Sequence, residues 1–262
     1  MAGLGPLGLN AAAAEPLSGK GMEYYELRVY HLKSSANREL LDAYLSKALI
    51  PGLNRLGIKR VGVLVQQNQT ADKQAPTEVR DPLAVLVLIP FPSIESLAAC
   101  GWRLNADPEY HSAGAEYLES AKANPAFERI DSWLMVAFAG MPMLELPAYC
   151  REKKPRMFEL RTYESHSELK AIKKVEMFNR GEIDLMREVG LGPIFYGQTL
   201  VGSNLPHLTY MVSAENQEAH KKHWDAFRAD PKWDKMKNDP QYADTVSKIT
   251  NRFLVPTAYS QI

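Results

Sequence analysis

Alternating apolar and polar positions, together with short apolar runs, predict eight β-strands along the chain. The first lies at residues 24–30, and the others lie at 58–66, 83–90, 130–138, 156–163, 194–201, 207–213 and 247–255. Between them, apolar residues recur every three or four positions, which predicts helices at 37–49, 93–101, 108–122, 167–189, 215–228 and 231–237. Pro51 and Gly52 interrupt the first helical pattern, and Asp107 followed by Pro108 is typical of a helix start.

The same motifs occur twice. Tyr25–Tyr30 reads YELRVY, and 133 positions later Phe158–Tyr163 reads FELRTY. At the same offset, Gly57 and Gly190 each follow a helical stretch and precede an apolar run. Motifs that recur in the same order indicate a tandem duplication.

A third motif also occurs twice and supports a division of the chain into two repeats. ADPEY at 106–110 is echoed by ADPKW at 229–233, and each half has the element order β-α-β-β-α-β of the ferredoxin-like motif. We therefore predict a flexible tail or signal-peptide remnant at 1–22, a first ferredoxin-like repeat at 23–140, a linker at 141–155 and a second repeat at 156–262.

In a chain with two such repeats, the sheet of each repeat can cover the open sheet face of the other. A ferredoxin-like sheet is covered by helices on one face, and its open face needs a partner. We expect an α+β fold in which the two sheets face each other in a pseudo-dimer that resembles a dimeric α+β barrel. Outer edge strands would remain in that arrangement, which favours a homo-oligomer.

The first strand of each repeat has a polar face, opposite Leu27 and Val29 in the first repeat. On that face lie Glu26, Arg28 and Tyr30 in the first repeat and Glu159, Arg161 and Tyr163 in the second. We predict that these side chains point into the space between the sheets and bind a small molecule, with arginine orienting an anionic or carbonyl group. The alternative is a self-satisfied network that fixes how the sheets meet.

Charge and hydropathy exclude two classes of partner. Lysine plus arginine and aspartate plus glutamate each total 31, so the chain lacks the cationic excess of a general nucleic-acid binder. The sequence contains no run of 18 apolar residues, so it predicts no transmembrane segment. Residues 1–14 are apolar but lack the positive start of a signal peptide. If they are a signal remnant, the protein is periplasmic or secreted, with the bacterial periplasm as the natural compartment; otherwise it is cytoplasmic.

The duplicated Y/F-E-L-R-x-Y strand, the glycine after the first helix and the D-P-x-aromatic helix start resemble the NIPSNAP family. The resemblance covers about residues 23–256. It implies a tandem relative of the dimeric α+β barrel superfamily, which includes small oxygenases and haem-handling enzymes. A shared fold does not carry a function across.

Three histidines are candidates for chemistry. A haem enzyme of that superfamily would need an axial histidine on a cavity-lining helix, and His111 lies on such a helix, where its repeat position is Asp234. It is our candidate for a ligand or acid–base role, with a surface histidine as the alternative. His220 and His223 share a helix face and could form half of a metal site, but no third ligand is spaced nearby. We therefore predict neither a metal nor a cofactor.

The sequence thus predicts a NIPSNAP-like protein of unassigned chemistry that binds a small molecule or partner through the inter-sheet space. The alternative is an oxygenase- or isomerase-like enzyme acting on a small apolar or aromatic substrate within the barrel. These residues do not decide whether the protein is an enzyme.

Overall fold

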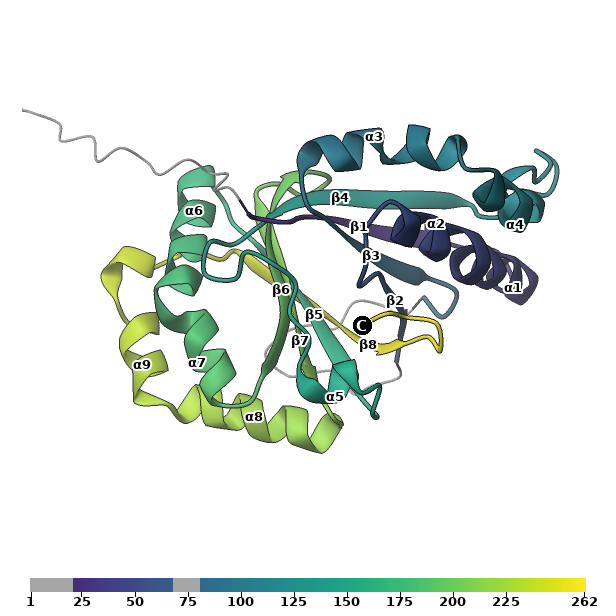
Figure 1. The fold of residues 1–262 in the computed structure, drawn as a ribbon. Helices are drawn as coiled ribbons and strands as arrows, with labels where there is room; N and C mark the ends of the chain where they lie inside the picture. The colour runs from purple at the N-terminus through teal and green to yellow at the C-terminus, as the bar shows by residue number, and fades with distance from the viewer. Residues whose placement is uncertain (1–20, 68–80) are drawn as a thin grey trace, which may run out of the picture.

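The computed structural model describes residues 21–67 and 81–262, and the predicted tail therefore lies almost wholly outside the described residues. Eight strands form one closed antiparallel barrel in this part of the chain (Figure 1). They are β1 (Tyr24–His31), β2 (Gly62–Gln66), β3 (Val85–Phe91), β4 (Arg129–Ala137), β5 (Met157–Glu164), β6 (Gly192–Val201), β7 (His207–Ala214) and β8 (Lys248–Pro256).

The strand order confirms the predicted fold. Around the barrel it is β1-β3-β2-β8-β5-β7-β6-β4, so the first repeat contributes β4-β1-β3-β2 and the second contributes β8-β5-β7-β6. The two repeats join through β2 with β8 and through β4 with β6, which relates them by an approximate twofold axis. Closure leaves none of the described strands with a free edge. The edge-strand argument for a homo-oligomer is therefore wrong.

Helices cover the outside of the barrel in two groups (Figure 1). The first repeat contributes α1 (Ser35–Tyr44), α2 (Ile50–Arg55), α3 (Ile94–Asn105) and α4 (Pro108–Leu118). The second contributes α6 (Glu168–Met177), α7 (Ile183–Glu188), α8 (Gln217–Ala229) and α9 (Pro231–Lys237). The predicted linker between the repeats contains one short helix, α5 (Ala148–Arg151), after Pro147.

The predicted break at Pro51 does not occur. The chain stays helical through a π turn at Leu45–Leu49 and continues into α2. Pro51 lies in the first turn of α2, and its nitrogen carries no hydrogen that would need an acceptor. A second π turn, Phe178–Glu182, lies 133 residues later between α6 and α7. Because the second π turn is not followed by a proline, the turn belongs to the duplicated architecture rather than to Pro51.

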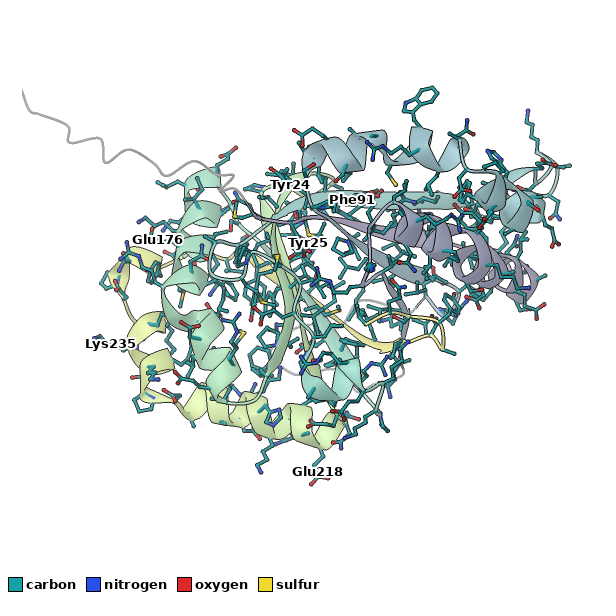
Figure 2. The ribbon with its side chains drawn as sticks, viewed as in Figure 1. Tyr24, Tyr25, Phe91, Glu176, Glu218 and Lys235 are labelled. Atoms are coloured by element: carbon teal, nitrogen blue, oxygen red, sulfur yellow. The ribbon has the colours of Figure 1, made fainter. Side chains whose placement is uncertain are left out.

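Three large apolar clusters and one small one pack the described part of the molecule. Of the large ones, the first packs α1 to α4 on the sheet of the first repeat, the second packs the helices of the second repeat on their sheet, and the third fills the barrel. Figure 2 shows side chains between the strands and both groups of helices. Leu27, Val29 and Leu160 belong to the barrel cluster, whereas Tyr30 and Tyr163 pack under the helices.

The predicted orientation of the polar strand face is therefore wrong. Glu26, Arg28 and Tyr30 in the first repeat and Glu159, Arg161 and Tyr163 in the second point toward the helices and away from the inter-sheet space. The physical reason is that both faces of each sheet are buried. Apolar side chains can fill the barrel, while the helices cover a polar row whose charges are paired.

Candidate functional site

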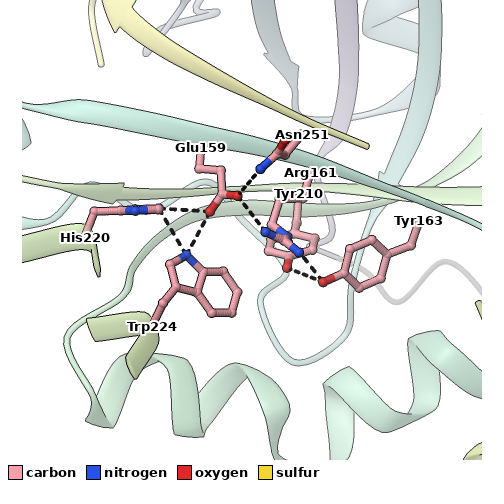
Figure 3. A network of polar contacts seen from close by, with 7 residues as sticks. All are labelled: Glu159, Arg161, Tyr163, Tyr210, His220, Trp224 and Asn251. Atoms are coloured by element: carbon pink, nitrogen blue, oxygen red, sulfur yellow. Dashed lines mark hydrogen bonds and ion pairs between the residues drawn. The ribbon is translucent and has the colours of Figure 1, made fainter. Parts of the chain in front are cut away.

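Glu159 is the centre of a buried polar network in the second repeat (Figure 3). Its Oε1 accepts from Nη1 of Arg161 at 2.6 Å and from Nδ2 of Asn251, on the neighbouring β8, at 2.9 Å. Its Oε2 accepts from Nε2 of His220 at 2.9 Å and from Nε1 of Trp224 at 2.8 Å. Both of these donors come from α8, so a single carboxylate ties the helix to the sheet.

These partners keep Glu159 ionised. Burial by itself raises the pKa of the carboxyl, but the charge of Arg161 and the hydrogen bonds from His220 and Asn251 outweigh that effect and lower the pKa to about 2. The carboxylate is thus a permanent negative charge under the helices, and it fixes the guanidinium of Arg161 beside it.

The first repeat contains the same core of the network without the helix contacts. Arg28 donates to both carboxylate oxygens of Glu26, and Ser132 occupies the β4 position that Asn251 occupies in β8. The ADP motifs align Trp224 with Gly101, 123 positions earlier. The Glu–Arg pair therefore occurs in both repeats, and in the second repeat an indole and an imidazole from α8 also bond its carboxylate.

A pocket of about 310 Å³ opens beside this network, between the sheet of the second repeat and its helices. We call it the helix-side pocket, and its lining residues are Arg161, Tyr163, Glu182, Trp224, Phe227, Arg228, Trp233, Lys237 and Ile249. Aromatic rings make up much of the wall, and the lining carries three cationic side chains against one carboxylate. A volume near 300 Å³ is at the lower end of the range for small-molecule sites.

The π turn shapes one wall of this pocket. It brings Glu182 within 2.7 Å of Nζ of Lys174, although the two residues are eight positions apart, and both side chains are almost fully buried. The ammonium group of Lys174 also lies over the ring of Phe178, at 4.7 Å from the centroid. π turns interrupt α-helices preferentially where a side chain must be re-aimed at a functional site.

Arg161 is the residue best placed to hold a ligand. Its Nη1 bonds Glu159, its Nε donates to the hydroxyl of Tyr163 at 3.3 Å, and its guanidinium lies over the indole of Trp224 at 4.8 Å. No described residue accepts a hydrogen bond from its Nη2. A guanidinium that is only 8% exposed, lines a pocket and has a spare donor can bind an anion or a carbonyl oxygen.

None of the three candidate histidines lines the helix-side pocket. His111 is exposed, and its Nε2 bonds the carbonyl oxygen of Asn105. His220 is buried in the Glu159 network, while His223 lies against Gly190. Within residues 21–67 and 81–262, no group of three histidine, cysteine or acidic side chains is arranged to bind a metal ion.

The helix-side pocket does not fit a haem group, because no histidine lines it and His220 already bonds Glu159. We therefore derive no haem chemistry for it. Sequence reasoning named Arg161 and Tyr163 but missed Lys174, Glu182 and Asn251. Trp224 was not among the residues predicted for the site. Only the tertiary fold brings these residues together, although the missing partner of Trp224 in the first repeat was a signal available in the sequence.

Solved structures share the fold over nearly the whole chain. A monooxygenase candidate from Lactobacillus acidophilus NCFM has a TM-score of 0.58 at 9% identity, covering 90% of this chain and 94% of its own. An anthrone oxidase-like protein has a TM-score of 0.50 at 11% identity, covering 90% of this chain and 92% of its own. At such identities the similarity shows the fold alone. No helix in the described part of the chain is long and apolar enough to cross a membrane.

Comparison with protein families gives a match to the second repeat. No curated protein sequence matches the chain. A NIPSNAP-like domain protein from Burkholderia xenovorans is 22% identical, with a TM-score of 0.37, covering 40% of this chain and 89% of its own. The NIPSNAP family profile matches residues 158–261, which begin at the FELRTY strand and end after β8. The similarity to the NIPSNAP family shown by this profile therefore covers the second repeat of the chain.

Proposed function

We propose that this protein binds a small organic anion with an aromatic or apolar body in the helix-side pocket of its second repeat. The observation that carries the proposal is the buried guanidinium of Arg161, whose Nη2 has no described partner and which lines a pocket walled by Trp224 and Trp233. A carboxylate would accept a charge-assisted hydrogen bond from that donor, and the ligand body would pack on the rings.

Charge at the mouth of the pocket supports an anionic ligand. Arg228 and Lys237 border the opening, and both are paired only with exposed carboxylates, Asp225 and Asp234. Exposed ion pairs are weak and exchange with solvent, so these cations remain available to attract an anion. The negative charge of Glu182 is paired with Lys174, so it does not repel an anionic ligand.

An enzyme acting on an aromatic substrate within the barrel has less support. The apolar cluster fills the barrel and leaves a cavity of about 70 Å³ at one end. Even a benzene molecule occupies a cavity of about 150 Å³ in a protein interior. The oxidase and monooxygenase names belong to proteins of 9–11% identity, and we carry no reaction over from them.

Titration calorimetry with a matched ligand series tests the proposal. Benzoate, phenylacetate and indole-3-acetate combine a ring with a carboxylate, benzamide lacks the charge and acetate lacks the ring. We expect at least one aromatic carboxylate to bind about tenfold more tightly than benzamide, because a charge-assisted hydrogen bond contributes about 1.5–3 kcal/mol. Equal affinity for benzamide, or no binding by any member, would contradict the proposal.

Self-association stays a second proposal, now on different grounds. Leu169 and Ile172 on α6 and Leu205 before β7 are 65%, 51% and 48% exposed, which is unusual for large apolar side chains. Light scattering coupled to size exclusion measures the oligomeric state, and a monomeric mass for both the native protein and Ile172→Glu would contradict self-association through this surface.

A further inference from the structure

Two tyrosine hydroxyls meet beside the guanidinium of Arg161 (Figure 3). The hydroxyl of Tyr163, on β5, lies 2.8 Å from the hydroxyl of Tyr210, on the neighbouring β7. Tyr163 lines the helix-side pocket, whereas Tyr210 is fully buried behind it. Tyr210 faces Arg161 across the two strands, and the residue that faces Arg28 in the first repeat is Val87. The second repeat therefore has a hydroxyl pair that the first repeat lacks at this position.

One of the two hydroxyl hydrogens has no acceptor within the described residues. Each tyrosine hydroxyl has one hydrogen to donate, and its oxygen can accept. Burial raises the pKa of Tyr210, so its hydroxyl keeps the hydrogen at pH 7. In the parts of the chain that the structure describes, each of these hydroxyls has only the other as an acceptor. A single bond between them uses one hydrogen and leaves the other free.

The free hydrogen belongs to Tyr163. A donor that is buried without an acceptor is costly, and Tyr210 is fully enclosed, so its hydrogen is used on the oxygen of Tyr163. That oxygen also accepts from Nε of Arg161 at 3.3 Å. With two donors on its oxygen, the Tyr163 hydroxyl has only its hydrogen left to use. Because Tyr163 lines the pocket, a ligand can accept that hydrogen.

The shape of the guanidinium places this hydrogen beside the free donor of Arg161. Nε and Nη2 of an arginine lie on one edge of the planar group and direct hydrogens to the same side. Nε bonds the hydroxyl oxygen of Tyr163, while Nη1 bonds Glu159. A ligand oxygen that accepts from Nη2 therefore lies next to the Tyr163 hydroxyl. One oxygen in that place can accept from both groups.

We propose that Tyr163 is a second donor to the anionic group of the ligand, and that one carboxylate oxygen accepts from both Nη2 of Arg161 and the Tyr163 hydroxyl. Tyr210 is a positioning residue that directs the hydrogen of Tyr163 into the pocket. This inference rests on the proposed binding of an organic anion in the helix-side pocket. The two donors select a group that only accepts, such as a carboxylate, over a hydroxyl group, whose own hydrogen would face them.

Calorimetric titration with benzoate, phenylacetate and indole-3-acetate tests the inference. Tyr163→Phe removes the second donor, and we expect about a tenfold to a hundredfold loss of affinity, as for one hydrogen bond to a charged group. Tyr30→Phe is the matched control, because Tyr30 has the same position in the first repeat and does not line the pocket. Its affinity should be native. Native affinity in Tyr163→Phe, or an equal loss in Tyr30→Phe, would overturn the inference.

Tyr210→Phe distinguishes a positioning role from a structural one. We expect a smaller loss of affinity, about twofold to tenfold, because Tyr163 keeps its hydrogen but loses the donor that directs it. In the Tyr163→Phe background the same substitution should have no further effect on affinity, whereas a merely structural effect would persist. Tighter binding in Tyr210→Phe than in the native protein would mean that Tyr163 donates to Tyr210, and would overturn the inference.

A crystal structure of the native protein with a bound aromatic carboxylate gives a test that needs no variant. We expect a carboxylate oxygen within hydrogen-bond distance of both Nη2 of Arg161 and the hydroxyl oxygen of Tyr163. A carboxylate bonded to Arg161 but more than about 3.5 Å from the Tyr163 hydroxyl would overturn this inference and leave the proposed function in place. An empty helix-side pocket would contradict both.

Discussion

Nη1 of Arg161 lies 2.6 Å from Oε1 of Glu159, and both side chains are withdrawn from solvent. The pair is one of two copies, since Arg28 and Glu26 have the same relation in the first repeat. In the second repeat, two donors from α8 also bond the carboxylate, and the guanidinium is held by Glu159 and Tyr163 while its Nη2 has no described partner. A binding arginine that is already positioned loses little conformational entropy when a ligand arrives.

Arg161→Lys should weaken ligand binding at least tenfold while the protein still folds. Lysine retains a positive charge for Glu159 but has no planar fork, so it cannot bond the carboxylate of Glu159 and the ligand together. Arg28→Lys is the matched control in the repeat whose Glu–Arg pair has no indole beside it. Calorimetric titration with the best aromatic carboxylate should give native affinity for Arg28→Lys and at least a tenfold loss for Arg161→Lys; equal losses would disprove the assignment.

Glu159 makes the protein sensitive to acid. Its folded pKa of about 2 lies below the ordinary value of a glutamate, so its stabilisation is complete above about pH 4.5 and is lost as the pH falls toward 2. Urea unfolding over this range should show the free energy of unfolding falling by a few kcal/mol. Glu159→Gln should be less stable than the native protein at pH 7 and should lose less stability across the same range. A native-like pH profile in Glu159→Gln would show that another group titrates.

The substitution Trp224→Phe keeps an aromatic ring at this position but removes the indole N–H. Phenylalanine preserves much of the packing but leaves Oε2 of Glu159 without one of its two donors, which should cost about 1–3 kcal/mol in the free energy of unfolding. Trp102→Phe is the control, because Trp102 is 80% exposed on α3 and should cost nothing measurable. Urea unfolding of both variants checks the expectation. Native stability of Trp224→Phe would mean that the hydrogen bond contributes no net stability.

Lys174 and Glu182 should show strong coupling. Removing either partner alone leaves a buried charge unpaired, and we expect Lys174→Met or Glu182→Met to cost about 3–5 kcal/mol. The double variant Lys174→Met/Glu182→Met replaces the ion pair with apolar groups and should be markedly more stable than the sum of the single losses implies. Additive losses in a double-mutant cycle would show that the two charges act independently.

The repeat, the element order and the barrel-like pairing of two sheets could be predicted from the sequence, because the ELR strand recurs within the same order of elements. The full closure of the barrel was not predicted, since outer edge strands were expected to remain. The six polar residues were also identified correctly as two equivalent rows. Their direction could not be predicted. Alternation shows which residues share a face, but not which face turns inward when helices cover one side and a second sheet covers the other.

The site itself depends on contacts that span long stretches of sequence. Asn251 reaches Glu159 from 92 positions away, and Trp224 reaches it from 65. The π turn that brings Glu182 to Lys174 has no sequence signal that periodicity detects, and the helix pattern runs through it unbroken. Local patterns thus predicted the elements, whereas the pocket results from their packing.

A crystal structure of the protein soaked with 4-iodobenzoate tests the central claim most directly, because anomalous scattering locates the iodine without reference to the expected site. We predict one strong iodine peak in the helix-side pocket between Trp224 and Trp233, with the carboxylate within hydrogen-bond distance of Nη2 of Arg161. An iodine peak only in the barrel or on the outer surface, with the helix-side pocket empty, would contradict it.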